Sequence, residues 1–193
     1  MIIGITGGTG SGKTTLLKLI EEMGGKVLDC DAIYHELLKT DKALLAAIED
    51  RFPGTVCGDV LDRKKLGTIV FNDQKALLDL NKIAHGAVKQ EVMRQLTPTP
   101  ELAAIDAIGL FEGGLAELCK LTVAITAPIE DRVARLMARD GITREYALAR
   151  INAQRSAEEF AEMCDVHLEN NGTEAQFREK CLAFLSGLGI MKA

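Results

Sequence analysis

The sequence predicts an α/β fold, a doubly wound parallel five-stranded sheet with an inserted helical subdomain and a helical lid. Three observations predict it. Apolar, β-rich runs alternate with stretches of helical periodicity, a pattern typical of parallel sheets covered by helices. A glycine-rich loop follows the first run directly. A block of about 65 helical residues separates the second run from the third, which is too long for one crossover helix. The five runs are residues 2–6, 26–28, 102–108, 121–126 and 166–168.

The glycine-rich loop at residues 7–14 reads Gly-Gly-Thr-Gly-Ser-Gly-Lys-Thr. It fills every fixed position of the phosphate-loop pattern G-x-x-x-x-G-K-[ST], and the preceding strand and following helix are the context that this motif requires. Its glycines let backbone N–H groups surround a phosphate at the positive end of a helix dipole. The sequence therefore predicts a nucleoside triphosphate site of a P-loop protein, with ATP as the expected ligand, and not a turn that merely caps a helix.

Two side chains of the loop carry specific chemistry. Lys13 supplies a mobile positive charge for the outer phosphates, and the Thr14 hydroxyl is suited to ligate Mg²⁺, the expected cofactor. The predicted ATP contacts in this region are Gly8, Thr9, Gly10, Ser11, Gly12, Lys13, Thr14 and Thr15.

The composition of the 193 residues narrows the function. It is that of a soluble globular domain, with 47% hydrophobic and 26% charged residues. A net charge of −5 argues against a broad nucleic-acid surface, and no apolar run approaches the roughly 20 residues that span a bilayer. The N-terminal run is a core strand, so we expect no cleavable signal. Five widely spaced cysteines indicate free thiols in a reducing cytoplasm. We expect a cytoplasmic protein that is a monomer or a weak homo-oligomer.

The predicted elements divide one P-loop domain into three parts. Residues 1–31, 101–129 and 164–193 form the nucleotide-binding core, residues 32–100 the acceptor subdomain, and residues 130–163 the lid. Polar residues before the helical patterns are expected to cap them. These predicted caps are Thr40, Asp62, Asn72 or Asp73, Thr143, Ser156 with Glu159, and Thr173 with Gln176.

Asp29 and Asp31 follow the second predicted strand directly. Two carboxylates at i and i+2 of an extended stretch point the same way, toward a metal or a hydroxyl. The alternative is that Asp31 only caps the helix beginning at Ala32 while Asp29 is solvated. Because this fold places its chemistry at the carboxyl ends of the strands, we favour function. Asp31 is then the carboxylate that orients an acceptor hydroxyl and takes its proton.

Two further acidic residues leave their roles open. Asp106 falls inside the third predicted strand, and Glu112 follows that strand. Either carboxylate can support Mg²⁺ through its waters, and either can be a structural hydrogen-bond acceptor. His85 belongs to the inserted helices, where a lone histidine is usually a surface or core residue. Lys82 and Lys89 are its neighbours in sequence, so a basic pocket for an anionic acceptor is the functional alternative.

Six arginines crowd the two helices of the predicted lid. Arginines interleaved with acids usually form a solvated helix face. However, two capped helices joined at Gly141 suit a hinged lid, and a lid arginine is the usual cation for a transferring phosphoryl group. Arg139, at the helix end beside that hinge, is the best placed.

The ordered set of motifs resembles the dephospho-CoA kinase family, nearly end to end from Ile3 to about Leu185. The phosphate loop alone is shared by many kinases, whereas the ordered set is specific. The matching segments are residues 4–15, 29–31, 61–63, 70–71, 80–85, 110–112 and 135–141, then Gln154, Asp165 and residues 170–172.

The resemblance implies transfer of the ATP γ-phosphoryl group to the ribose 3′-hydroxyl of dephospho-CoA. It implies that Asp31 is the acceptor-side carboxylate, Lys13 and Thr14 the phosphate and Mg²⁺ contacts, and Arg139 the lid cation. The helices of residues 32–96 would bind the CoA moiety. Asn170 would lie by the adenine, and the acceptor contacts would be Asp31, His85, Phe111 and Glu112.

The sequence departs from the family pattern at three places. Gly86 stands where the family usually has proline, Ile108 begins a run that is usually proline-led, and Phe160 stands at a commonly basic lid position. The alternatives are another small-metabolite or nucleoside monophosphate kinase, or a nucleotide-gated regulator without an acceptor. Asp29 and Asp31 together with an arginine-bearing lid favour an enzyme, since a sensor needs neither an acceptor base nor a closing cation.

Overall fold

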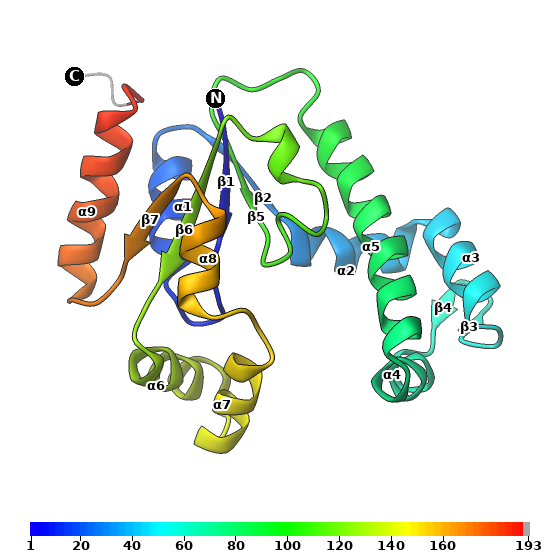
Figure 1. Cartoon of the computed structure of the whole chain (residues 1–193). Helices are drawn as coiled ribbons and strands as arrows, with labels where there is room; N and C mark the ends of the chain where they lie inside the picture. Colours follow the sequence, from blue (N-terminus) through cyan, green and yellow to red (C-terminus); the bar gives the residue numbers. More distant parts are fainter. Residues whose placement is uncertain (191–193) are drawn as a thin grey trace. The chain divides into compact units, whose positions relative to one another are not determined.

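The computed structural model describes residues 1–190 of the chain. Helical segments separate the successive strands of the main sheet along the chain (Figure 1). The chain divides into two compact units. The larger comprises residues 1–28, 100–110 and 116 onward and contains the main sheet, whereas the smaller comprises residues 29–99 and 111–115 and is mostly helical.

The larger unit is built on five strands in the order β2-β5-β1-β6-β7. β1 (Ile2–Thr6) pairs in parallel with β5 (Ala103–Asp106) on one side and with β6 (Leu121–Thr126) on the other. β7 (Val166–Glu169) pairs in parallel with β6, and β2 (Lys26–Asp29) neighbours β5. The predicted doubly wound five-stranded sheet is confirmed. The strand that leads into the phosphate loop is therefore the central one.

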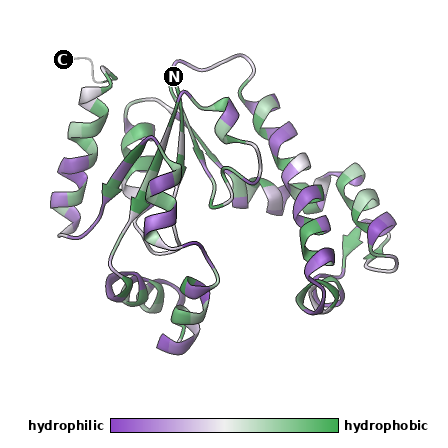
Figure 2. Ribbon diagram, viewed as in Figure 1, coloured by the Kyte–Doolittle hydropathy of each residue, from purple (hydrophilic) through white to green (hydrophobic). Residues whose placement is uncertain are grey.

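Hydrophobic side chains explain why these segments form a buried sheet. Ile3, Ile5 and Val123 have no exposed surface, and the strands are coloured largely hydrophobic in Figure 2. Burying a side chain of this size stabilises the fold by about 1.5–3 kcal/mol. Helices α1 (Lys13–Glu22) and α9 (Glu174–Gly187) pack against each other and contribute side chains to the same core.

The segment after β6 forms the three helices α6 (Ile129–Asp140), α7 (Arg144–Asn152) and α8 (Ala157–Met163). Gly141 ends α6 in the left-handed conformation, with φ of 65°, which glycine adopts without steric cost. The Thr143 hydroxyl accepts from the N–H of Tyr146 and caps α7. α6 and α7 lie side by side (Figure 1).

Two capping boxes predicted from the sequence are confirmed. Ser156 and Glu159 exchange side-chain and backbone hydrogen bonds at the start of α8, and Thr173 and Gln176 do the same at the start of α9. In each pair the side chains satisfy backbone N–H groups that have no partner within the helix. Local sequence therefore determines where these helices begin.

The smaller unit is a cluster of four helices around its own hydrophobic core, which includes the fully buried Ile48. Its long helix α5 contacts each of the other three. The helices are α2 (Cys30–Thr40), α3 (Lys42–Arg51), α4 (Arg63–Asn72) and α5 (Gln74–Gln95).

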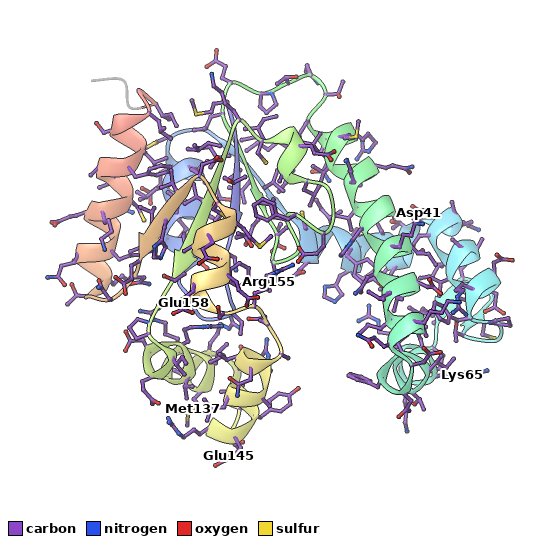
Figure 3. The ribbon with its side chains drawn as sticks, in the orientation of Figure 1. Asp41, Lys65, Met137, Glu145, Arg155 and Glu158 are labelled. Atoms are coloured by element: carbon purple, nitrogen blue, oxygen red, sulfur yellow. The ribbon has the colours of Figure 1, made fainter. Side chains whose placement is uncertain are left out.

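This unit corrects one expectation, because the predicted helical block also contains a hairpin of β3 (Val56–Cys57) and β4 (Val60–Leu61). The chain entering the hairpin is held by polar contacts that have no helical periodicity. The carboxylate of Glu49 accepts from the N–H groups of Gly54 and Val56, and Lys65, labelled in Figure 3, donates to the Gly54 carbonyl at 2.7 Å.

The helix caps of the smaller unit are mostly as predicted. Asp62 caps α4 and Asp73 caps α5. The prediction of Thr40 as a cap is wrong, because Asp41 (Figure 3) accepts from the first N–H groups of α3. Thr40 is the last residue of α2, and its hydroxyl donates to the carbonyl of Glu36 one turn earlier.

The third predicted strand is shorter than the residues 102–108 expected. β5 ends at Asp106, so this aspartate lies at the C-terminal end of the strand rather than inside it. The chain still follows β1 for two more residues, since Ala107 N–H donates to the Ile5 carbonyl and the Thr6 hydroxyl donates to the Ile108 carbonyl. Among the helices of residues 1–190, none combines the length and the apolarity needed to cross a membrane.

Candidate active site

The phosphate loop connects the end of β1 to the first turn of α1. Gly12 takes the N-cap position of α1 in the left-handed conformation, with φ of 101°, and Gly10 has φ of 77°. A helix that begins this way leaves its first N–H groups without partners inside the helix, at the positive end of its dipole. The loop is therefore shaped to hold an anion, as the sequence predicted.

Lys13 lies across the loop. Its Nζ donates to the carbonyl of Gly7 at 3.1 Å and lies 3.8 Å from the Asp106 Oδ1. Both side chains are mostly buried, with 13% of the Lys13 and 19% of the Asp106 side-chain surface exposed. The ammonium group is thus oriented by protein groups on the loop side and on the β5 side.

The carbonyl groups of the loop are held by side chains that come from distant segments. Asn170, directly after β7, donates from Nδ2 to the Ser11 carbonyl at 2.9 Å and is buried. Arg135 of α6 donates to the carbonyls of Gly10 at 3.0 Å and Ser11 at 3.3 Å. Because these carbonyl oxygens accept hydrogen bonds from a guanidinium group and an amide group, the conformation of the loop backbone is fixed.

Asn170 was expected beside the adenine. Its amide N–H group instead donates to the Ser11 carbonyl, so in the structure Asn170 supports the loop backbone. A side chain at Gly12 would come within 2.3 Å of the Asn170 Nδ2, so glycine is required at this contact. The adenine contact stays a prediction.

Arg132 and Gln154 also contact the loop, and sequence reasoning gave neither a role. Arg132 donates from Nε to the Thr9 carbonyl at 2.9 Å, and the Gln154 Oε1 accepts from the Thr9 N–H at 2.8 Å. Arg132 is only 5% exposed, so it does not belong to a solvated helix face. Two signals were present in the sequence: Arg135 and Gln154 belong to the segments that match the family, and the spacing of Arg132 and Arg135 places both on one face of α6.

A cavity of about 480 Å³ borders Arg132 and Gln154. Its walls come from the end of β6, the start of α6 and the connection between α7 and α8, and include Arg132 and Gln154. Arg155, which precedes α8, and Glu158, in the first turn of α8, also line it (Figure 3). The contacts between the loop and the α6–α8 segment are therefore next to open space and not embedded in the hydrophobic core.

Arg139, the predicted lid cation, is exposed at the end of α6. It forms two hydrogen bonds to the carboxylate of Asp140, at 2.6 and 3.0 Å, and Arg150 donates to the same carboxylate at 2.7 Å. The hydrogen bonds from Arg139, with those from Arg150, lower the pKa of Asp140 to about 2. The catalytic role of Arg139 stays a prediction. Met137 and Glu145 mark the same two lid helices in Figure 3.

Asp31 lies in the first turn of α2, in the smaller unit, and is exposed. The expectation of an extended stretch carrying Asp29 and Asp31 is wrong, because the helix already begins at Cys30. Asp29 caps it by accepting from the N–H of Ala32 at 3.0 Å, so the capping role falls to Asp29 and not to Asp31. The carboxylate of Asp31 is thereby left available for another function.

The other predicted acceptor contacts belong to the same unit as Asp31. His85 lies on α5 and is half-buried, Phe111 is half-buried, and Glu112 is exposed. Phe160, at the commonly basic lid position, is a buried residue of α8 with 3% exposure. A basic side chain at position 160 would have to leave water, so this position does not supply a lid cation here.

Similarity to known proteins identifies the family. A family model described as dephospho-CoA kinase matches residues 1–176. A dephospho-CoA kinase from Carboxydothermus hydrogenoformans is 35% identical over 190 residues, which cover 95% of this chain and 92% of that protein. The solved structure of TT1252 from Thermus thermophilus aligns with a TM-score of 0.82 and 34% identity, covering 100% of this chain and 98% of that one.

A second solved structure, the dephospho-CoA kinase from Campylobacter jejuni, aligns with a TM-score of 0.69 and 26% identity over 98% of both chains. These similarities span the phosphate loop, both units and the predicted lid. As its motifs predicted, the chain belongs to the dephospho-CoA kinase family.

Proposed function

We propose that this chain transfers the γ-phosphoryl group of ATP to the 3′-hydroxyl of the ribose of dephospho-CoA, the last step of coenzyme A synthesis. The match of the dephospho-CoA kinase model to residues 1–176 carries the proposal. The geometry of the phosphate loop supports it, because the loop presents the start of a helix and an oriented lysine to an anion. Membership of a kinase family decides against a non-enzymatic regulator and against kinases of other metabolites.

On the donor side, Lys13 contacts the outer phosphates of ATP. Its ammonium group is already oriented by the Gly7 carbonyl and by Asp106, so little rearrangement is needed before it stabilises the charge of the transferring group. Backbone N–H groups of the loop bind the remaining phosphate oxygens, apart from those of Thr9, Ser11 and Thr15, which donate to acceptors within the protein.

The residues around the loop fit Mg²⁺ held jointly with ATP. Within residues 1–190, no cluster of three or more His, Cys, Asp or Glu side chains is suited to hold a metal. Mg²⁺ usually keeps several waters and takes one or two protein ligands besides phosphate oxygens. Thr14 offers an exposed hydroxyl in the first turn of α1, and Asp106 offers a carboxylate near Lys13. When bound, Mg²⁺ neutralises charge on the β- and γ-phosphates.

On the acceptor side, Asp31 orients the ribose hydroxyl and accepts its proton. Its exposed carboxylate is not used to cap α2, and a positioned general base typically contributes 10²–10⁴-fold to the rate. The acceptor subdomain is residues 32–100, which include His85, and the further acceptor contacts Phe111 and Glu112 follow it in the chain. The alternative role of Glu112 or Asp29 is support of the metal through water.

Residues 130–163 act as the lid. Closure releases Arg139 from Asp140 and brings its guanidinium to the transferring phosphoryl group, where a cation has its largest effect. The enzyme works in the cytoplasm as a monomer or weak homo-oligomer, with ATP and dephospho-CoA as its partners and without nucleic acid or membrane. Its exposed Cys57 suits a reducing compartment.

The proposal is tested by measuring ADP release from the purified chain with ATP, Mg²⁺ and a panel of acceptors. The panel contains dephospho-CoA, shikimate, gluconate and nucleoside monophosphates. We expect turnover with dephospho-CoA and only background release with the others. Turnover with another member of the panel, and none with dephospho-CoA, would select a different kinase reaction.

A further inference from the structure

Thr9, at the tip of the phosphate loop, and the side chains of Arg132 and Gln154 are joined to one another by three hydrogen bonds. Thr9 donates its N–H to the Gln154 Oε1 at 2.8 Å, and its carbonyl accepts from the Arg132 Nε at 2.9 Å. Arg132 also donates from Nη2 to the same Gln154 Oε1 at 3.3 Å. Both backbone polar groups of Thr9 are therefore bound by two side chains that also bind each other. This set of Thr9, Arg132 and Gln154 is called the loop latch below.

The loop tip packs directly on Arg132. A side chain at Gly8 would come within 2.2 Å of the Arg132 Nη2, and one at Gly10 within 2.9 Å of the Arg132 backbone oxygen. The two glycines therefore leave room for Arg132 as well as for a phosphate. Any movement of Arg132 changes what supports the loop from Gly8 to Gly10.

The charge of Arg132 is not neutralised by an acid. Among the described residues no carboxylate forms an ion pair with it, and its recorded acceptors are the neutral oxygens of Thr9 and Gln154. The residue is 5% exposed, and burial lowers its pKa from the usual value. Because its acceptors are neutral, the positive charge of Arg132 still attracts an anion that binds at the loop.

We infer that Gln154 and Arg132 are positioning residues for the nucleotide, which hold the loop tip in its phosphate-binding conformation before ATP arrives. The inference rests on the proposed function and adds a specific requirement, a neutral acceptor at position 154. Gln154 accepts from an amide and from a guanidinium without adding charge. Because Arg132 comes from α6 and Gln154 follows α7, the latch also ties the conformation of the lid segment to that of the loop.

The neutral-acceptor requirement separates positioning from mere structural support. Gln154→Glu retains an oxygen acceptor and gains an ion pair with Arg132, so the folded state loses no contact. The added negative charge then faces the site of a polyanion and cancels the field of Arg132. Gln154→Ala removes the acceptor without adding charge. Truncation is tolerated by the fold because Gln154 borders a cavity and is only half-buried.

The experiment measures ATP affinity by calorimetry, without acceptor, together with thermal unfolding and the two KM values. For Gln154→Ala we expect ATP affinity to fall about tenfold, the equivalent of one well-placed hydrogen bond. Gln154→Glu should lose more ATP affinity than Gln154→Ala while keeping or raising the wild-type unfolding temperature. The KM for dephospho-CoA should stay unchanged in both. Asn152→Ala, an exposed amide two residues earlier, is the matched control and should behave as wild type.

Two outcomes overturn the inference. One is unchanged ATP affinity in both variants at position 154. The other is wild-type ATP affinity in Gln154→Glu with a loss in Gln154→Ala, because a plain structural acceptor would then suffice. If Gln154→Ala does not fold, the comparison of Gln154→Glu with wild type still decides. Because ATP binding is measured without acceptor, failure of the latch is distinguishable from failure to phosphorylate dephospho-CoA.

Discussion

The ammonium nitrogen of Lys13 lies 3.8 Å from the carboxylate of Asp106, across the mouth of the phosphate loop. Asp106 ends strand β5 and Gly7 directly follows the neighbouring strand β1, so groups at two neighbouring strand ends orient one cation. The Gly7 carbonyl accepts from the same ammonium group at 3.1 Å. This arrangement supports the prediction that Lys13 contacts the phosphates of ATP.

Replacing Lys13 tests the donor side. Lys13→Ala removes the oriented cation, so we expect kcat/KM for ATP to fall by about 10²–10³-fold, as for loss of one preorganised donor. Steady-state kinetics with dephospho-CoA measure it. Lys18→Ala, an exposed lysine on the same helix, is the control and should retain wild-type kinetics. Near-normal turnover in Lys13→Ala would remove the nucleotide site from the account.

Replacing Asp31 tests the acceptor side. Asp31→Asn keeps the size of the side chain and removes its basicity, so we expect kcat to fall by about 10²–10⁴-fold. ATP affinity should be unchanged, because the loop residues are untouched. Glu36→Gln, an exposed acid on the same helix, should leave kcat unaltered. A wild-type kcat in Asp31→Asn would show that another group takes the proton.

Replacing Arg139 tests the lid. Arg139→Ala should lower kcat by about 10³-fold, the lower end of the effect of a catalytic arginine, with a smaller change in ATP affinity. Arg144→Ala serves as control, since Arg144 is an exposed lid arginine that pairs with Glu130. Equal, small effects of the two substitutions would mean that Arg139 only forms its surface ion pair with Asp140.

A stability prediction concerns Asp165, the residue directly before β7. The hydroxyl and the backbone N–H of Thr122 both donate to the Asp165 carboxylate. These hydrogen bonds, the one from the hydroxyl most of all, lower the pKa of Asp165 below its usual value. A lowered folded-state pKa stabilises the fold above the unfolded value of about 3.9, and this contribution is lost as the pH falls further.

Asp165→Asn should therefore reduce the free energy of unfolding at pH 7, by less than about 1 kcal/mol because the carboxylate is exposed and its charge is screened by solvent. The difference from wild type should shrink as the pH falls below about 3.9. Denaturant unfolding of both proteins at a series of pH values measures it. A difference that is constant down to acid pH would show that the carboxylate charge has no part in this contact.

The local parts of the fold could be predicted from sequence because their causes are local. The phosphate loop, the capping boxes at Ser156 and Thr173 and the end of α6 at Gly141 depend on residues within a few positions of one another. The hairpin of β3 and β4 was missed, because its strands are two residues long and carry no readable period. Asp31 was expected in an extended stretch but lies in a helix, because the capping role considered for Asp31 belongs to Asp29.

The loop latch could not be predicted, because its partners are far apart in the sequence. Arg132 and Thr9 are separated by 123 positions, and Gln154 and Thr9 by 145. Only the folded arrangement of α6 and the α7–α8 connection brings them to the loop. A helical pattern of alternating charges does not distinguish a buried arginine from an exposed one, so the sequence alone does not separate Arg132 from Arg139.

The most direct test of the account follows the γ-phosphoryl group of ATP into dephospho-CoA by ³¹P NMR, with the purified chain and Mg²⁺. We predict a new phosphomonoester signal on the ribose 3′-oxygen, appearing in step with ADP. Release of inorganic phosphate alone, with dephospho-CoA unchanged, would contradict the proposed transfer.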